Sequence, residues 1–156
     1  MRISAFAALL LAACTATPPA TTAEQPSPAA QPRWTSAADG AGASLTHVDA
    51  GGTRRATLRC HATGEGLLVN VSGFSPVASE ERMSLGAGSV VTVLVADTAG
   101  DRARGGVSGE APVPAELAAI VGSPAGVRIN YGYQDIGPLP AIPADQARAF
   151  VTRCGG

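Results

Sequence analysis

Few side chains in this sequence can do acid–base or nucleophilic chemistry near neutral pH. His47 and His61 are the two histidines, and histidine is the side chain whose ordinary pKa lies closest to neutrality. We expect each of them on a solvated strand face rather than in a catalytic site. Gly106-Val107-Ser108-Gly109 approaches the Gly-x-Ser-x-Gly nucleophile elbow, but Glu110 stands where the last glycine is required. The sequence therefore predicts a protein that is not an enzyme.

All eleven basic residues are arginines, and the absence of lysine excludes several chemistries. A Walker-A phosphate site, a Schiff base and a Ser-x-x-Lys acyl-enzyme each require a lysine. The segment Leu85-Gly86-Ala87-Gly88 lacks the glycine spacing of dinucleotide-binding turns, so no cofactor is expected. A metal site is disfavoured too, because the adjacent Cys60 and His61 would point to opposite faces of a strand.

The first thirteen residues have the pattern of an export signal. Met1-Arg2 provides a positive start, and Ile3–Ala13 is an apolar run in which Ser4 is the one polar residue. Eleven helical residues rise about 16 Å, whereas the hydrocarbon core of a bilayer is ~30 Å thick. A signal peptide over residues 1–13 therefore fits better than a permanent membrane span.

The run ends in Leu11-Ala12-Ala13-Cys14, which resembles the lipobox of bacterial lipoproteins. The resemblance implies that Cys14 receives a diacylglyceryl group, that cleavage precedes it, and that a further acyl chain such as palmitate is added to its amine. Several acyl chains give stable anchoring where one does not. Thr15 stands where aspartate marks inner-membrane retention in related proteins, which implies the periplasmic face of the outer membrane. The alternative is an ordinary secretory leader, with Cys14 lost or free.

The segment after Cys14 has the composition of a spacer. Residues 15–32 contain five prolines, five alanines and a single charge, too little apolar surface to offset the entropy of ordering. An extended polyproline-like chain of this length spans up to roughly 55 Å. We expect a lipidated, disordered tether over residues 14–32 and one globular domain over residues 33–156.

If Cys14 carries lipid, Cys60 and Cys154 are the remaining cysteines. Both fall on predicted core-facing stripes, and the envelope outside the inner membrane is oxidising. We expect a disulfide that joins the C-terminal helix to an early hairpin and contributes on the order of 4 to 5 kcal/mol in the chain-entropy model. The alternatives are two buried free thiols or one reactive thiol.

Hydrophobic periodicity predicts an α+β, mainly β domain, a small antiparallel sandwich or barrel. Residues 54–62 and 67–74 form a predicted hairpin, residues 89–96 a strand buried on both faces, and residues 105–113 and 126–133 further strands. Asp97–Asp101 is interpreted as a hairpin turn. A short helix is expected near residues 114–121 with Gly122 as its C-cap, and a C-terminal helix near residues 143–153.

Three aromatic residues are the candidates for ligand contact. Tyr131 and Tyr133 share a face of one predicted strand and could stack on a sugar or peptide, although such pairs more often belong to a core or an interface. Trp34, at the junction of tether and domain, would instead pack the first strand down. The cluster of Arg54, Arg55 and Arg59 is either a solvated strand end or a partner-binding patch.

The mature chain would carry ten arginines against twelve acidic residues, and such a balance does not favour nucleic acid as a partner. The leading hypothesis is a membrane-anchored envelope lipoprotein that binds a protein or peptidoglycan component without catalysis. The alternative is an inhibitor of a lysozyme or another hydrolase. The plan of a lipobox, a short domain and Cys60 paired with Cys154 is similar to small periplasmic lysozyme-inhibitor lipoproteins, but their Ser-Gly-x-x-Tyr loop is absent after Cys60. An enzyme is the third possibility.

Overall fold

The computed structural model describes residues 30–61 and 66–155. The predicted signal peptide, the predicted lipid-attachment residue Cys14 and all but the last residues of the predicted tether lie outside this part of the chain. The described elements, in chain order, are β1 (Arg33–Asp39), β2 (Gly42–Val48), β3 (Arg54–His61), β4 (Leu67–Val71), β5 (Arg82–Ala87), β6 (Val90–Ala96), β7 (Val107–Ala111), α1 (Leu117–Val121), β8 (Arg128–Tyr131), β9 (Gln134–Ile136) and α2 (Ala144–Gly155).

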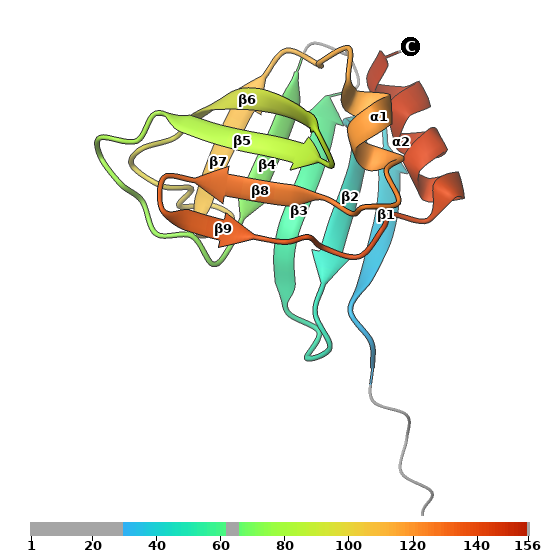
Figure 1. The fold of residues 1–156 in the computed structure, drawn as a ribbon, viewed down its shortest axis with the longest axis horizontal. Coiled ribbons are helices and arrows are strands. Elements are labelled where there is room, and N and C mark those ends of the chain that lie inside the picture. Colours follow the sequence, from blue (N-terminus) through green and yellow to red (C-terminus); the bar gives the residue numbers. More distant parts are fainter. Residues whose placement is uncertain (1–29, 62–65, 156) are drawn as a thin grey trace, which may run out of the picture.

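The described strands form one antiparallel sheet in the order β1-β2-β3-β4-β7-β6-β5-β8-β9. The sheet curls into a half-barrel (Figure 1), so its inner face can enclose a single core. Alternation explains the two faces: Ala56, Leu58 and Cys60 of β3 are buried inward, while the residues between them point outward. The prediction of a mainly β domain of the α+β class is confirmed, with one curled sheet as its architecture.

The two helices lie together at one side of the half-barrel (Figure 1), where α2 packs next to β1 and β2, and α1 next to β5 and β6. Helix α2 buries Ala147, Phe150 and Cys154, the stripe at helical spacing that the sequence indicates. Helix α1 begins at Leu117 rather than near Pro114, because the residues before it form a separate turn in which the Leu117 N–H donates to the Pro114 carbonyl. The expected C-cap at Gly122 and the C-terminal helix are both present.

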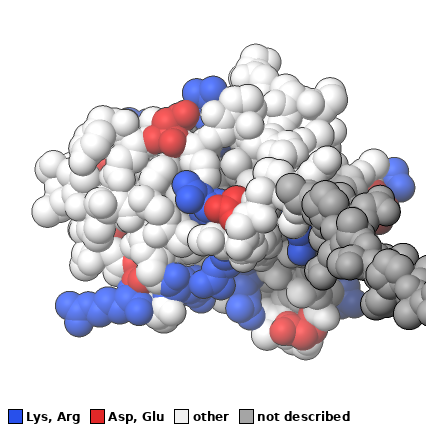
Figure 2. All heavy atoms as spheres, turned by 90° about the horizontal axis from the view of Figure 1, so that it is seen from below, with Lys and Arg blue, Asp and Glu red and all other residues white. Residues whose placement is uncertain are grey.

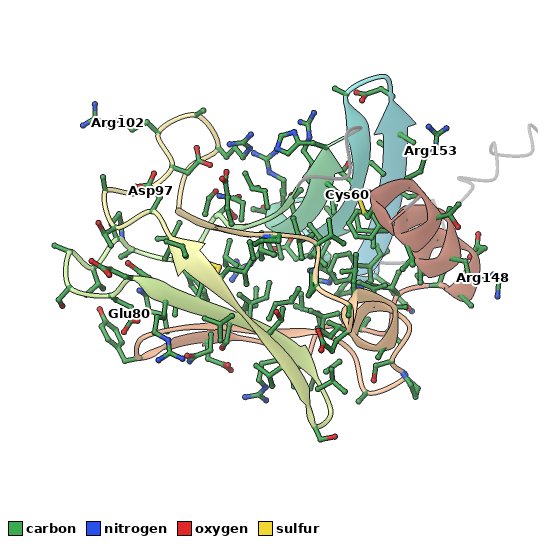
Figure 3. All side chains as sticks on the ribbon, turned by 90° about the horizontal axis from the view of Figure 1, so that it is seen from above. Cys60, Glu80, Asp97, Arg102, Arg148 and Arg153 are labelled. Atoms are coloured by element: carbon green, nitrogen blue, oxygen red, sulfur yellow. A yellow bond between two sulfur atoms is a disulfide. The ribbon has the colours of Figure 1, made fainter. Side chains whose placement is uncertain are left out.

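A disulfide joins Cys60 on β3 to Cys154 on α2, across 94 residues of sequence. Both cysteines are buried in the core cluster, and Figure 3 shows Cys60 beside α2. These are the two cysteines that the sequence analysis pairs, and the bond links the C-terminal helix to β3 and β4, which pair antiparallel as the predicted hairpin requires.

The prediction that residues 89–96 form a strand buried on both faces is wrong. Strand β6 is buried on its inner side at Leu94 and Ala96, but Val91, Val93 and Val95 are exposed on its outer side. An uninterrupted apolar run does not reveal whether a second layer covers the strand, and neither helix packs on this outer face.

The single strand predicted over residues 126–133 is also wrong. Strand β8 ends at Tyr131, the chain turns at Gly132 and Tyr133, and β9 runs back along β8 from Gln134. Gly132 has φ +58°, a conformation that residues with a side chain rarely adopt, and it makes the tight turn possible. Tyr131 and Tyr133 therefore do not share a strand face.

Candidate binding surface

Trp34 and His47 are neighbours on the inner face of the sheet, where β1 pairs with β2. Their rings meet edge to face with centroids 5.3 Å apart, and Trp34 Nε1 donates to the Pro140 carbonyl at 2.7 Å. Both side chains are buried. Trp34 therefore packs β1 against the core instead of contacting a ligand, and the expectation that His47 lies on a solvated face is wrong.

His47 lacks the partners that a catalytic base requires. Neither of its ring nitrogens has a hydrogen-bond partner among the described residues. Burial lowers its pKa below the ordinary 6.5, the Asp49 charge partly opposes this shift, and Arg55 adds to it. His47 is thus a neutral imidazole within the core, without an acid to orient it or a hydroxyl to activate. His61, in contrast, is exposed at the end of β3.

Tyr131 is a core residue and not the ligand platform proposed from the sequence. Its hydroxyl accepts from the Val77 N–H at 3.1 Å and donates to the Val77 carbonyl at 3.0 Å, and its ring stacks on Phe74. These contacts hold the β4–β5 connection against the core. Tyr133 alone of the three aromatic candidates is accessible, with 84% of its surface exposed in the β8–β9 turn.

A buried polar network fastens the β6–β7 loop to the outer face of the sheet. Ser108 on β7 donates to the Asp101 carboxylate at 2.6 Å, and Asn70 on β4 donates to the Ser108 hydroxyl at 3.1 Å. Asp101 also accepts from the backbone N–H groups of Ala103 and Arg104 and from the Arg104 guanidinium. The hydrogen bond from Ser108, assisted by Arg104, holds the Asp101 pKa well below its usual range.

This chemistry rules out Ser108 as an activated nucleophile. An aspartate whose pKa is lowered is a poor proton acceptor, and neither histidine is a partner of the hydroxyl in the network. The turn predicted at Asp97–Asp101 is confirmed, since the Gly100 N–H donates to the Asp97 carbonyl. The role of these carboxylates is to shape a loop, and the sequence pattern showed the turn but not the partner residues on β4 and β7.

The fastened loop forms one wall of a cleft on the outer face of the sheet, with a volume of about 720 Å³. Its floor is formed by residues of β4, β6 and β7. The residues that line the cleft include Leu68, Val95, Arg102, Arg104 and Glu110.

Five arginines gather beside this cleft, and we call them the arginine face: Arg54, Arg55, Arg59, Arg102 and Arg104. Arg55 and Arg59 project from the outer side of β3, and Arg59 lies opposite Leu68 of the cleft floor. The Arg54 guanidinium donates to the Arg104 carbonyl at 3.5 Å, which brings the strand and the loop together. Basic side chains line one edge of the molecule in Figure 2.

The charges of the arginine face are only partly neutralised. Arg104 pairs with Asp101 at 2.9 Å, and Arg55 lies 3.9 Å from Asp49. Arg54, Arg59 and Arg102 have no ion pair within the described part of the chain. Figure 3 shows Arg102 extending away from its loop, on the side of the molecule opposite Arg148 and Arg153 of α2.

Comparison with protein-family models, curated proteins and solved structures finds no match to this chain. No three or more His, Cys, Asp or Glu side chains cluster to hold a metal ion within residues 30–61 and 66–155. In the same residues, no helix has both the length and the apolar character needed to cross a bilayer.

Proposed function

We propose that this chain is a lipid-anchored, non-enzymatic binding module of the cell envelope, and that it holds an anionic cell-wall polymer on its arginine face. The observation that carries the proposal is the concentration of five arginines beside one cleft in a chain whose formal charge is −1. A local cluster of positive charge attracts a polyanion to that surface. Because the net charge of the protein is close to zero, the rest of its surface does not bind polyanions non-specifically.

Arginine is suited to a carboxylate-bearing partner. Its planar guanidinium can donate two parallel hydrogen bonds to one carboxylate, which a lysine ammonium does not match. The peptide stems of peptidoglycan end in carboxylates, spaced regularly along the polymer. Arg55 and Arg59 are four residues apart on one strand face, a separation of about 13 Å, so they can contact separate carboxylates at once.

The expected anchor agrees with this role. A tether of residues 15–32 reaches up to roughly 55 Å, which would carry a domain anchored at Cys14 from the inner leaflet of the outer membrane toward the wall. Lipidation is tested by the mass of the mature N-terminal peptide from membranes, which should begin at Cys14 and carry acyl chains. A mature N-terminus elsewhere, without acyl mass, would contradict the anchor but not the arginine face.

The binding proposal is tested by co-sedimentation of the protein with purified peptidoglycan sacculi. We expect Arg55→Gln with Arg59→Gln to weaken binding about tenfold or more, because charge-assisted hydrogen bonds contribute about 1.5–3 kcal/mol each. The matched control is Arg148→Gln with Arg153→Gln, which removes the same charge from α2 on the other side and should leave binding unchanged. Equal loss in both pairs, or no sedimentation of the wild-type protein, would overturn the proposal.

The inhibitor alternative is separated by a second assay. The wild-type protein is added to a lysozyme that is digesting the same sacculi, and the rate is followed with and without the arginine substitutions. Stoichiometric inhibition in solution with a soluble oligosaccharide substrate would favour the inhibitor. Protection confined to sacculi, and lost with Arg55→Gln and Arg59→Gln, would favour binding to the wall polymer.

A further inference from the structure

A row of valines on β6 forms an exposed apolar strip, which reaches the cleft beside the arginine face at Val95. Val91, Val93 and Val95 are 59%, 47% and 72% exposed, and only Tyr133 is another large hydrophobic residue so exposed in the described part of the chain. The three alternate with inward-facing residues, so they stand on one face of one strand. Contiguous exposed aliphatic side chains of this kind mark interaction surfaces.

On the side of β5, the strip is bordered by residues with small side chains or none. Val93 lies opposite Ser84 in the register, and Val91 lies opposite Gly86. A Cβ atom at Gly86 would come within 2.9 Å of Val91 Cγ2, so the Val91 side chain extends over the glycine. Because these neighbouring residues are small, the valine side chains protrude above them. Protruding side chains of this kind can pack against the face of another sheet.

Charges flank the strip at one end, with opposite signs on the two sides. Val95 pairs in register with Arg82 on β5 and with Glu110 on β7. Both charged residues are exposed on their strands, and neither has an ion-pair partner among the described residues. With Val95 between them, they are separated by two strand spacings, about 9.6 Å between backbones.

This pattern is complementary to itself. A twofold axis that runs along β6 between two facing sheets lays the valines of one copy on those of the other. It also exchanges the two flanks, so that Arg82 of each copy faces Glu110 of its partner. A twofold axis perpendicular to β6 would instead place Val95 over Val91. Neither Arg82 nor Glu110 would then face an opposite charge. Closed twofold contacts of this isologous kind are the commonest form of protein self-association.

We propose that two copies of this chain associate face to face through the outer side of β6, with Arg82 and Glu110 forming two symmetric ion pairs around the valine strip. The strip reaches the cleft beside the arginine face at Val95 and Glu110, but it contains none of the five arginines, so the proposal does not depend on the proposed function.

Analytical ultracentrifugation of the exported full chain with Cys14→Ser, which removes any acyl contribution, tests the proposal. We expect the dimer to be detected as the protein concentration is raised to roughly 100 μM, which is the range in which weak complexes form. Arg82→Glu or Glu110→Arg alone should weaken the dimer about tenfold or more, because each places like charges opposite one another twice. The matched control Tyr133→Ser, which removes an exposed ring elsewhere, should leave the dimer unchanged.

Charge exchange separates this arrangement from any other. The double variant Arg82→Glu, Glu110→Arg should dimerise like the wild type, and a mixture of the two single variants should form a heterodimer. Circular dichroism confirms that each variant is folded. A wild-type chain that stays monomeric, or single variants that the exchange does not rescue, would overturn the proposal.

Discussion

The Ser108 hydroxyl donates a 2.6 Å hydrogen bond to the Asp101 carboxylate, and this contact fastens the β6–β7 loop to the sheet. Asn70 supports it from β4, through hydrogen bonds to Ser108 and to the carbonyl of Gly105 at 2.9 Å. Two arginines of the arginine face, Arg102 and Arg104, belong to this loop. The network therefore positions a charged surface, and it resembles a nucleophile site only in the types of its residues.

Replacing Asp101 should loosen that loop. Asp101→Asn puts an amide N–H₂ where Ser108 and Arg104 both donate, so we expect a loss of about 1–3 kcal/mol in the free energy of unfolding, measured in urea at pH 7. Because the Asp101 pKa is lowered in the folded state, its stabilisation is present above the unfolded pKa near 4 and is lost as the pH falls further.

The control for this substitution is Asp39→Asn in the β1–β2 turn. Among the described residues, Asp39 accepts a side-chain hydrogen bond only from the Ala41 N–H, and an amide oxygen can replace that acceptor. We expect little change. An equal loss of stability in both variants would show that the Ser108–Asp101 contact contributes nothing of its own.

His47 should make the domain less stable in mild acid. Its folded-state pKa lies below 6.5, so the unfolded chain binds the proton more readily, and stability falls as the pH drops below about 6.5. In His47→Phe, which keeps an aromatic ring beside Trp34, the difference in unfolding free energy between pH 8 and pH 5 should be smaller than in the wild type. A wild-type slope retained by His47→Phe would refute the assignment.

The Tyr131 hydroxyl should be worth measurable stability, whereas that of Tyr133 should not. Tyr131→Phe removes both hydrogen bonds to Val77. The Val77 carbonyl still accepts from the Glu80 N–H, but the half-buried Val77 N–H loses its partner, so we predict a loss of about 1–3 kcal/mol. Tyr133→Phe alters an exposed hydroxyl and should be neutral within about 0.5 kcal/mol. Thermal unfolding of the two variants compares them directly, and similar melting temperatures would contradict the burial difference.

Loss of the disulfide should be the most destabilising of these changes. Cys60→Ala with Cys154→Ala opens a loop of 94 residues in sequence separation, for which the chain-entropy model gives about 4 to 5 kcal/mol. Urea unfolding of the wild type with and without reductant should reproduce the difference. A double variant as stable as the oxidised wild type would show that packing of α2 alone holds the C-terminus.

Local pattern predicted the parts of the fold that alternation and spacing determine. The inward face of β3, the β3–β4 hairpin, the stripe on α2 and the cysteine pair follow from periods of two and of about 3.6 residues. The strands β1, β2 and β5 were not identified, because small and polar residues weaken their alternation. The end of β8 was not predicted, because the alternating pattern continues through the turn at Gly132 and conceals it.

The candidate surface could not be read from the sequence in the same way. The exposure of Val93 depends on what covers β6, and the Asp101 network depends on Asn70, 31 positions earlier in the chain. Arg54, Arg55 and Arg59 were visible as a cluster, with a solvated strand end as the alternative interpretation. Only the fold brings Arg102 and Arg104 to the same edge.

The most direct test of the account is the salt dependence of binding to purified sacculi. If the arginine face carries the interaction, the wild-type affinity should fall steeply between roughly 50 mM and 200 mM salt, because charge pairs at a surface are screened over about 8–10 Å. The slope should flatten in Arg55→Gln with Arg59→Gln and persist in Arg148→Gln with Arg153→Gln. Binding that is independent of salt, or slopes that are equal in both pairs, would contradict the central claim.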